Sequence, residues 1–164
     1  MTIFVKNKDT LIFDDFKFKC CVGKNGFSKN KIEGDKKTPI GTFELDHLYL
    51  RKDRKKKPNT KLRVINIKKV MGWCDDIRSK DKYNKLINVK TMLRCEKLFR
   101  HDSKYDFFIP IKYNWKNIKL GEGSAIFLHL TKSFKPTAGC IGLSEKDFLI
   151  ILKLIKRKTK IQIL

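Results

Sequence analysis

Alternating polar and apolar positions mark the clearest strand in the chain. Phe16, Phe18 and Cys20 alternate with Lys17 and Lys19. This two-residue period is that of a β-strand with one face buried and the other in water. The N-terminal part of the chain is therefore expected to form sheet rather than helix.

Other segments share the β-branched and aromatic composition of strands. Strands are predicted at residues 2–5, 11–13, 16–22 and 62–67, with a turn region at residues 23–31. Residues 107–111 and 125–130 are almost wholly apolar, which is typical of buried strands. Residues 161–164 are expected to add a short final strand. Together these segments predict a domain dominated by sheet.

The region after Ser144 carries the clearest helical pattern. Ser144 can cap a helix, and Asp147 stands where the acidic member of a capping box belongs. The apolar residues that follow have the i, i+3, i+4, i+7 spacing of a core-facing stripe: Phe148, Ile151, Leu152 and Ile155. Positive charge suits the C-terminal end of the helix dipole, and the last turns are expected to hold Lys153, Lys156 and Arg157. A second helix is predicted over residues 92–100.

Length and charge limit the class of protein. A chain of 164 residues fits one domain, residues 1–164, with a single core. The net charge of +22, from 39 Lys and Arg against 17 Asp and Glu, would attract nucleic acid, anionic lipid or acidic wall polymers. The densest basic run, residues 51–57, lies in a predicted loop and fits a solvated surface. The sequence contains no base-stacking aromatic motif of the kind that indicates a nucleic-acid-binding protein.

The cysteines and histidines show neither disulfide nor metal spacing. Five cysteines form no regular pattern, and four of them are interpreted as buried apolar residues: Cys20, Cys21, Cys74 and Cys95. The histidines, His47, His101 and His129, have no paired ligand nearby, so no metal site is predicted. The first fifteen residues lack the apolar core of a secretion signal, and no apolar run of about 18 residues would span a membrane. Taken literally, this predicts a cytoplasmic protein.

One segment combines residue types used in acyl transfer. An apolar strand ends at His129, a loop follows, and Cys140 emerges beside Gly139 just before the predicted helix. A free thiol has a pKa of about 8.5, so an imidazole nearby would raise its reactivity. Amides of residues 138–140 could donate to a developing oxyanion. From these residues alone, a buried apolar cysteine and a hydrogen-bonded core histidine remain the simpler alternatives.

Two ordered motifs carry a family resemblance. Thr137-Ala-Gly-Cys140, preceded by His129, resembles the active-site signature of the L,D-transpeptidase catalytic domain family. Upstream, the segment Gly34-Asp-Lys-Lys-Thr-Pro-Ile-Gly-Thr-Phe43 resembles a Gly-x-x-x-Thr-Pro-x-Gly-x-Phe loop of the same family. Smaller matches to a compact branch of that family lie between and after them: Trp73-Cys-Asp-Asp76, Tyr83-Asn84, Tyr105-Asp106, Tyr113-Asn114 and residues 121–129. The matches span most of the chain in family order.

The resemblance implies a mainly β, sandwich-type catalytic domain with one or two short helices. It implies peptidoglycan stem peptides or muropeptides as partners, the bacterial cell envelope as the usual compartment, and no metal or organic cofactor. Cys140 would attack the third residue of a tetrapeptide stem and release D-alanine. Transfer to an amine would make a 3→3 cross-link, and transfer to water would make the enzyme an L,D-carboxypeptidase. A non-catalytic basic module that binds polyanions is the alternative from another class.

The resemblance also assigns residue roles. His129 would be the general base, oriented by a backbone carbonyl near Thr137, while the amides of Gly139 and Cys140, with Ala138 beside them, would form the oxyanion hole. A substrate groove is expected from six further residues: Trp73, Asp75, Asp76, Tyr83, Asn84 and Ser124. The Thr38–Gly41 turn is interpreted as scaffold near the cleft. The family often has His where Ala138 stands and Arg or Asn where Gly142 stands. If the side chain at position 142 holds a donor carboxylate in the family, another cation must replace it here, and Arg78 and Arg94 are the candidates.

Overall fold

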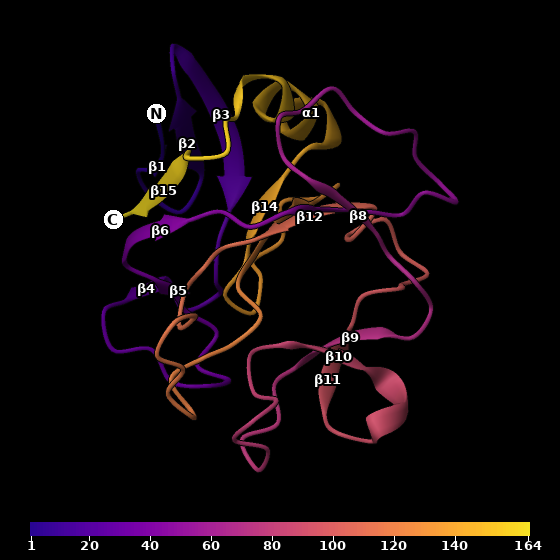
Figure 1. Cartoon of the computed structure of the whole chain (residues 1–164). Coiled ribbons are helices and arrows are strands. Elements are labelled where there is room, and N and C mark those ends of the chain that lie inside the picture. The colour runs from indigo at the N-terminus through magenta and orange to yellow at the C-terminus, as the bar shows by residue number, and fades with distance from the viewer.

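A large curled sheet forms the body of the molecule (Figure 1). The computed structural model describes residues 1–164. The strands of this sheet are β1 (Thr2–Val5), β2 (Thr10–Phe13), β3 (Phe16–Cys21), β6 (Gly41–Glu44), β7 (Leu48–Leu50), β8 (Val64–Asn66), β12 (Phe107–Pro110), β13 (Phe127–Leu130), β14 (Ile141–Leu143) and β15 (Lys160–Ile163). Their order is β6-β15-β1-β2-β3-β14-β13-β12-β7-β8. The mainly β fold is confirmed, with the strand ends shifted by one to a few residues.

The two halves of the sheet meet where β3 pairs with β14. Strand β14 runs parallel to β13, with His129 opposite Gly142 in the register. Strand β1 runs parallel to β15, so the two chain ends lie on the same side of the molecule, at opposite ends of this strand pair (Figure 1). The centre of the sheet thus contains the strand that ends near His129 and the strand that begins after Cys140.

Two smaller sheets complete the fold. One contains β9 (Met71–Cys74) between β10 (Leu86–Asn88) and β11 (Cys95–Lys97); the other pairs β4 (Phe27–Ser28) with β5 (Thr38–Pro39). A 3₁₀ helix, η1 (Val89–Thr91), connects β10 to β11. In Figure 1 the three-stranded sheet lies on the far side of the large sheet from the α-helix.

The helix predicted over residues 92–100 is wrong, because this segment contains β11. Met92 has a left-handed backbone with φ of 61°, which ends the preceding 3₁₀ turn, and its side chain is 92% exposed. Cys95 then pairs with Cys74 on the edge of β9. Pairing with the open edge of β9 determines the conformation of this segment and outweighs its local preference for helix.

The single α-helix, α1 (Glu145–Leu154), begins as predicted at Ser144. The Ser144 hydroxyl accepts a hydrogen bond from the Asp147 amide at 3.1 Å and donates to the Asp147 carboxylate at 2.7 Å. The whole predicted stripe is buried: Phe148, Ile151, Leu152 and Ile155. The helix ends at Leu154, so only Lys153 lies in its last turn, and the prediction that Lys156 and Arg157 also do is wrong.

Two hydrophobic clusters lie on opposite faces of β13. Leu128 and Leu130 belong to the main core, which also contains the buried stripe of α1. Phe127 belongs to a smaller aromatic cluster, here called the second cluster: Tyr49, Ile67, Trp73, Leu98, Tyr105, Phe108 and Phe127. Because successive side chains of a strand point to opposite faces, His129 points to the same side as Phe127. It lies edge-on to Tyr105, with the ring centroids 5.7 Å apart.

Candidate active site

Cys140 lies immediately before β14 and packs against the second cluster. Its sulfur donates a hydrogen bond to the Ala125 carbonyl oxygen at 3.2 Å and accepts one from the Phe127 amide at 3.4 Å. Burial of the sulfur raises the pKa of Cys140 to about 12, although the Phe127 amide opposes this change. The resting thiol is therefore protonated at neutral pH and needs a base before it can act as a nucleophile.

His129 is buried at the end of β13, and one of its ring nitrogens has no partner. Nδ1 lies 2.8 Å from the Leu130 carbonyl oxygen, which can only accept, so Nδ1 carries the proton. Nε2 is then the acceptor nitrogen, and this buried atom makes no hydrogen bond. Burial lowers the pKa of His129 to about 4, with a smaller opposing effect from the Leu130 carbonyl. The ring is neutral and oriented, as a general base requires.

The parallel pairing of β13 and β14 brings Cys140 and His129 to one wall of a shared cleft. The cleft has a volume of about 560 Å³, and both residues line it. The resting thiol donates to the Ala125 carbonyl oxygen, and no hydrogen bond joins it to the imidazole of His129. The carbonyl that orients the imidazole belongs to Leu130, and its expected position near Thr137 is wrong.

Thr137 organises the loop of residues 137–140, here called the nucleophile loop. Its hydroxyl donates to the Cys140 carbonyl oxygen at 2.6 Å and accepts from the Gly139 amide at 3.1 Å. The Gly139 amide is thus occupied, contrary to its expected place in an oxyanion hole. The amides of Ala138 and Cys140 donate no hydrogen bond within the chain, which leaves them free for a ligand oxygen.

The Thr38–Gly41 turn contacts the nucleophile loop directly. Thr38 is buried, and its hydroxyl donates to the Gly139 carbonyl oxygen at 2.9 Å while accepting from the Gly23 amide at 2.8 Å. Gly139 has φ of 139°, and a Cβ at this position would lie 2.8 Å from the Lys37 carbonyl oxygen. The two sequence motifs therefore meet in space, and the glycine is required for their close approach.

Comparison with known families decides the identity of the fold. The family model described as the L,D-transpeptidase catalytic domain (YkuD) matches residues 1–163. The chain belongs to this family. No curated protein and no solved structure shows significant similarity to it. Enzymes of the L,D-transpeptidase family act on peptidoglycan peptides, and the chain has the fold of their catalytic domain.

None of the helical segments in this L,D-transpeptidase domain has the length and hydrophobicity that crossing a bilayer requires. No group of three or more His, Cys, Asp or Glu side chains is placed to hold a metal ion.

The six expected groove residues of this transpeptidase domain separate into two sets. Asp75 and Ser124 line the cleft. The other four are buried and do not line it: Trp73, Asp76, Tyr83 and Asn84. The Asn84 amide oxygen accepts from the Trp73 indole at 2.9 Å and from the Ala125 amide at 3.1 Å. These four residues support the cleft wall rather than forming its surface.

A Gly at position 142, where the family often has Arg or Asn, has a structural reason. A Cβ on Gly142 would lie 2.7 Å from the Cys21 sulfur, on the neighbouring strand β3. Of the two arginines considered as replacements, Arg94 lines the cleft and pairs with Asp75 at 3.0 Å. The Arg78 side chain is 79% exposed, pairs with Asp76 and does not line the cleft.

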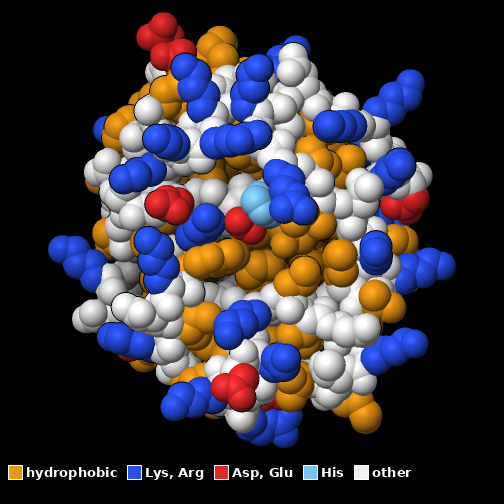
Figure 2. Space-filling model, viewed as in Figure 1, with side chains coloured by type: hydrophobic (Ala, Val, Ile, Leu, Met, Phe, Trp, Pro, Cys, Tyr) orange, Lys and Arg blue, Asp and Glu red, His pale blue; other side chains and the backbone are white.

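Sequence reasoning missed four charged residues of the cleft: Lys31, Glu33, Glu96 and Lys104. Of these, only Glu33 could have been placed near the cleft from the sequence, since it directly precedes Gly34, the first residue of the upstream motif. The others come from loops and from the small strand β11, whose positions the sequence pattern does not indicate. Their charges give the L,D-transpeptidase cleft both signs, whereas the charged side chains scattered over the face in Figure 2 are mostly basic.

Proposed function

We propose that the protein is a peptidoglycan L,D-transpeptidase that forms 3→3 cross-links through an acyl-enzyme on Cys140, with His129 as general base. The donor is a tetrapeptide stem, and the bond broken joins its third residue to the terminal D-alanine. The acceptor is the side-chain amine of a diaminopimelate on a second stem. Its site of action would then be the bacterial cell envelope.

The first step needs a proton transfer between two neutral groups. The pKa of Cys140 is raised to about 12 and that of His129 is lowered to about 4, so a resting thiolate–imidazolium pair is disfavoured. The thiol therefore gives up its hydrogen bond to the Ala125 carbonyl oxygen, and its proton passes from the sulfur to Nε2 of His129 as the sulfur attacks the donor carbonyl carbon. The new oxyanion accepts hydrogen bonds from the free amides of Ala138 and Cys140.

The next steps return the proton and transfer the acyl group. The imidazolium of His129 donates its Nε2 proton to the nitrogen of the departing D-alanine as the peptide bond breaks, leaving a thioester on Cys140. The acceptor amine then attacks the thioester carbonyl, and Nε2 takes a proton from that amine. The sulfur leaves and regains this proton, so the enzyme ends as a thiol and a neutral imidazole.

The observation that carries this proposal is the buried, unpartnered Nε2 of His129 in the cleft that Cys140 also lines. Purified protein is incubated with tetrapeptide muropeptides, and the products are identified by mass spectrometry. Cross-linked dimer supports transpeptidation, and tripeptide without dimer identifies the L,D-carboxypeptidase instead. The absence of both products would contradict both reactions.

Carbapenem labelling tests the two residue roles separately from the acceptor. The β-lactam carbonyl should form an adduct on Cys140 that is absent in Cys140→Ser and slowed in His129→Ala. The matched control is His101→Ala, because His101 is an exposed histidine that does not line the cleft. Equal labelling of His129→Ala and wild type would remove His129 as the base.

A basic groove supports the alternative in which the protein binds an anionic polymer. It has a volume of about 570 Å³ and is lined by Lys52, Asp53, Arg54, Lys55, Lys56 and Lys57, among others. Such a surface would bind polyanions in a salt-sensitive way. If Cys140→Ala left the cellular role unchanged, this binding activity would replace catalysis as the function.

A further inference from the structure

Two charged side chains of the cleft have no ion-pair partner, although the other four do. Arg94 pairs with Asp75, Glu96 pairs with Arg100, and Lys31 pairs with Asp35. Glu33 and Lys104 make no ion pair. Glu33 is unpaired even though the chain has 39 Lys and Arg that could bind it. An unpaired carboxylate and an unpaired ammonium in one cleft fit a ligand that carries both charges.

Neutral donors hold the Glu33 carboxylate in place. One of its oxygens, Oε2, accepts from the Ser124 hydroxyl at 2.7 Å and from the hydroxyl of the buried Tyr83. The other oxygen, Oε1, accepts no hydrogen bond from the chain. The Glu33 amide also donates to the Gly121 carbonyl oxygen at 2.7 Å, which fixes the backbone. Glu33 is thus a positioned carboxylate with a free oxygen, ready to accept from an ammonium group.

The Lys104 backbone is fixed beside the end of β13. Its amide donates to the Asp102 carboxylate at 3.1 Å, and its carbonyl oxygen accepts from the Leu130 amide at 3.1 Å. Leu130 directly follows His129, so the partly buried Lys104 side chain enters the cleft from the imidazole side. Its ammonium forms no ion pair with any carboxylate of the chain.

The two charges flank the thiol from opposite ends of the same segment. Glu33 contacts Ser124, the neighbour of the residue whose carbonyl accepts from Cys140, while Lys104 contacts Leu130 beyond His129. We propose that Lys104 binds the terminal carboxylate of the departing D-amino acid and that Glu33 binds the ammonium at the end of the acyl residue's side chain. This assignment rests on the proposed function.

The assignment explains which bond would be cleaved. His129 must protonate the departing amine, and the carboxylate of the same departing residue is then within the region that Lys104 occupies. A residue in the middle of a peptide has no free carboxylate to offer, so cleavage is restricted to the C-terminal residue. Glu33 would select donors whose third residue ends in an amine.

Binding to full-length Cys140→Ala protein tests the assignment without turnover. The ligands are an unmodified tetrapeptide, its C-terminal amide, and the tetrapeptide with the side-chain amine of residue three acetylated. Each modification should weaken binding by roughly tenfold, measured by titration calorimetry. In the same background, Lys104→Met should no longer distinguish acid from amide, and Glu33→Gln should no longer distinguish amine from acetylamine.

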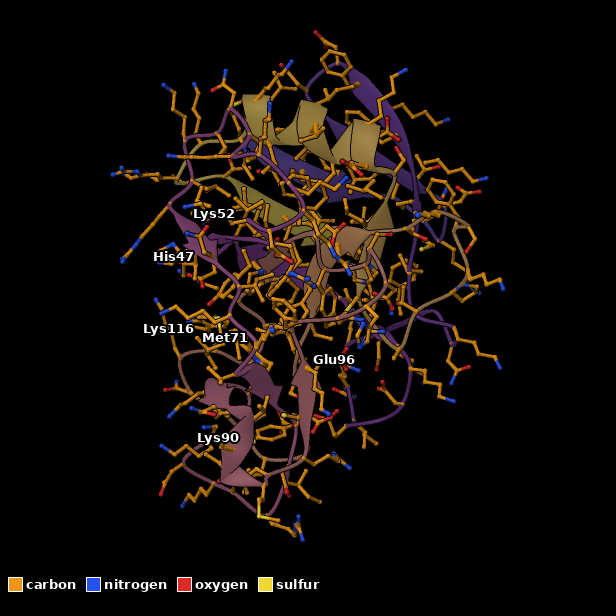
Figure 3. All side chains as sticks on the ribbon, turned by 90° about the vertical axis from the view of Figure 1, so that its right-hand side faces the viewer. His47, Lys52, Met71, Lys90, Glu96 and Lys116 are labelled. Atoms are coloured by element: carbon orange, nitrogen blue, oxygen red, sulfur yellow. The ribbon has the colours of Figure 1, made fainter.

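Lys116→Met is the matched control, because it removes one exposed, unpaired positive charge outside the cleft. Figure 3 shows Lys116 at the margin of the molecule, well apart from Glu96 of the cleft. This variant should keep both discriminations. The assignment would be overturned if amidation weakened binding to Lys104→Met as much as to the parent, or if acetylation weakened binding to Glu33→Gln as much as to the parent. It would also be overturned if the unmodified ligand did not bind.

Turnover by the wild-type protein is measured separately with the same three peptides. Cross-linked or tripeptide product without charge-specific binding overturns the roles of Glu33 and Lys104 and leaves the reaction standing. Charge-specific binding without either product overturns the proposed reaction and leaves the binding assignment standing.

Discussion

The Thr38 hydroxyl donates a 2.9 Å hydrogen bond to the carbonyl oxygen of Gly139, across 101 residues of sequence. The same hydroxyl accepts from the Gly23 amide at 2.8 Å. Thr38 belongs to the upstream motif, and Gly139 directly precedes Cys140. The two motifs are therefore one structural unit, in which the first fixes the backbone from which the thiol projects.

Replacing Thr38 by Val removes this link while keeping the side-chain shape. The Gly23 amide and the Gly139 carbonyl both lose a buried partner, so the free energy of unfolding should fall by about 1–3 kcal/mol. Carbapenem acylation of Cys140 should also slow, because the nucleophile loop loses its support. Urea unfolding and adduct formation by mass spectrometry measure the two effects.

Thr38→Ser is the control for this prediction, since it keeps the hydroxyl and removes only a methyl group. Its acylation rate should stay close to that of the wild type. An acylation rate in Thr38→Val equal to that in Thr38→Ser would show that the hydrogen bond to Gly139 does not position the thiol.

Adding a methyl group at Gly139 should be more damaging than its size suggests. The new Cβ would lie 2.8 Å from the Lys37 carbonyl oxygen, and φ of 139° is unfavourable for any residue with a side chain. Gly139→Ala should lower the free energy of unfolding by about 1–3 kcal/mol and reduce acylation of the folded protein. Thermal unfolding and carbapenem labelling provide the measurements.

Gly26→Ala separates backbone strain from close approach. Gly26 also has positive φ, 79°, but a Cβ there would meet only the flexible Lys8 side chain at 3.4 Å. This variant should be destabilised without a loss of acylation in the folded fraction. Equal loss of acylation in both glycine variants would contradict a specific role for the contact between Gly139 and Lys37.

Local patterns were enough to predict many of the strands of the main core and the start of α1, but not β7 or β14, which also contribute to that core. In β13, neighbouring residues alternate between the two hydrophobic clusters, and Ser144 caps the helix with its own side chain. The small sheet was not predictable in this way. Its strands are three or four residues long, and Cys95 pairs with Cys74 because the edge of β9 is available. Such pairing depends on tertiary contacts rather than on sequence periodicity.

In the candidate site, too, some residues could be predicted from the local sequence and others depend on tertiary contacts. Cys140 and His129 belong to one short sequence motif, which predicted that they act together, and both line the cleft. Lys104 enters the cleft from a loop whose place beside β13 is set by tertiary contacts, including its own hydrogen bond with Leu130. Trp73 and Asn84 were expected on the cleft surface, yet their hydrogen bond to each other is buried behind it. Burial of a polar side chain depends on the packing around it, which a linear motif does not contain.

Stability should depend on pH through His129. Burial lowers its pKa from 6.5 to about 4, so the unfolded chain binds more protons than the folded protein between these values. The free energy of unfolding should therefore rise as pH increases from about 4 to about 6.5, by about 3 kcal/mol in total. Urea unfolding across this range, compared between wild type and His129→Gln, measures the contribution.

Other groups titrate in acid as well, including Asp102, whose pKa the neighbouring Arg100 guanidinium lowers to about 2. The informative quantity is therefore the difference between the two pH profiles. His101→Gln is the control, because His101 is exposed and should leave the profile unchanged. A profile of His129→Gln that parallels the wild type between pH 4 and 6.5 would show that His129 is not held neutral by the fold.

Asn84→Ala should damage both the fold and the cleft. The Asn84 amide donates to the Tyr113 and Asn114 carbonyl oxygens at 3.1 and 2.7 Å and accepts from the Trp73 indole and the Ala125 amide. Removing it leaves buried donors and acceptors without partners, and Ala fits φ of 54° less well than Asn. The free energy of unfolding should fall by about 2–4 kcal/mol.

The effect on chemistry follows from Ala125, because its carbonyl oxygen accepts from the Cys140 thiol while its amide donates to Asn84. Loss of Asn84 should release this backbone and slow carbapenem acylation in protein that is still folded, as judged by tryptophan fluorescence. Asn66→Ala, at an exposed position of β8, is the matched control and should change neither quantity strongly. Normal acylation of folded Asn84→Ala would show that the backbone at Ala125 keeps its place without the buried amide.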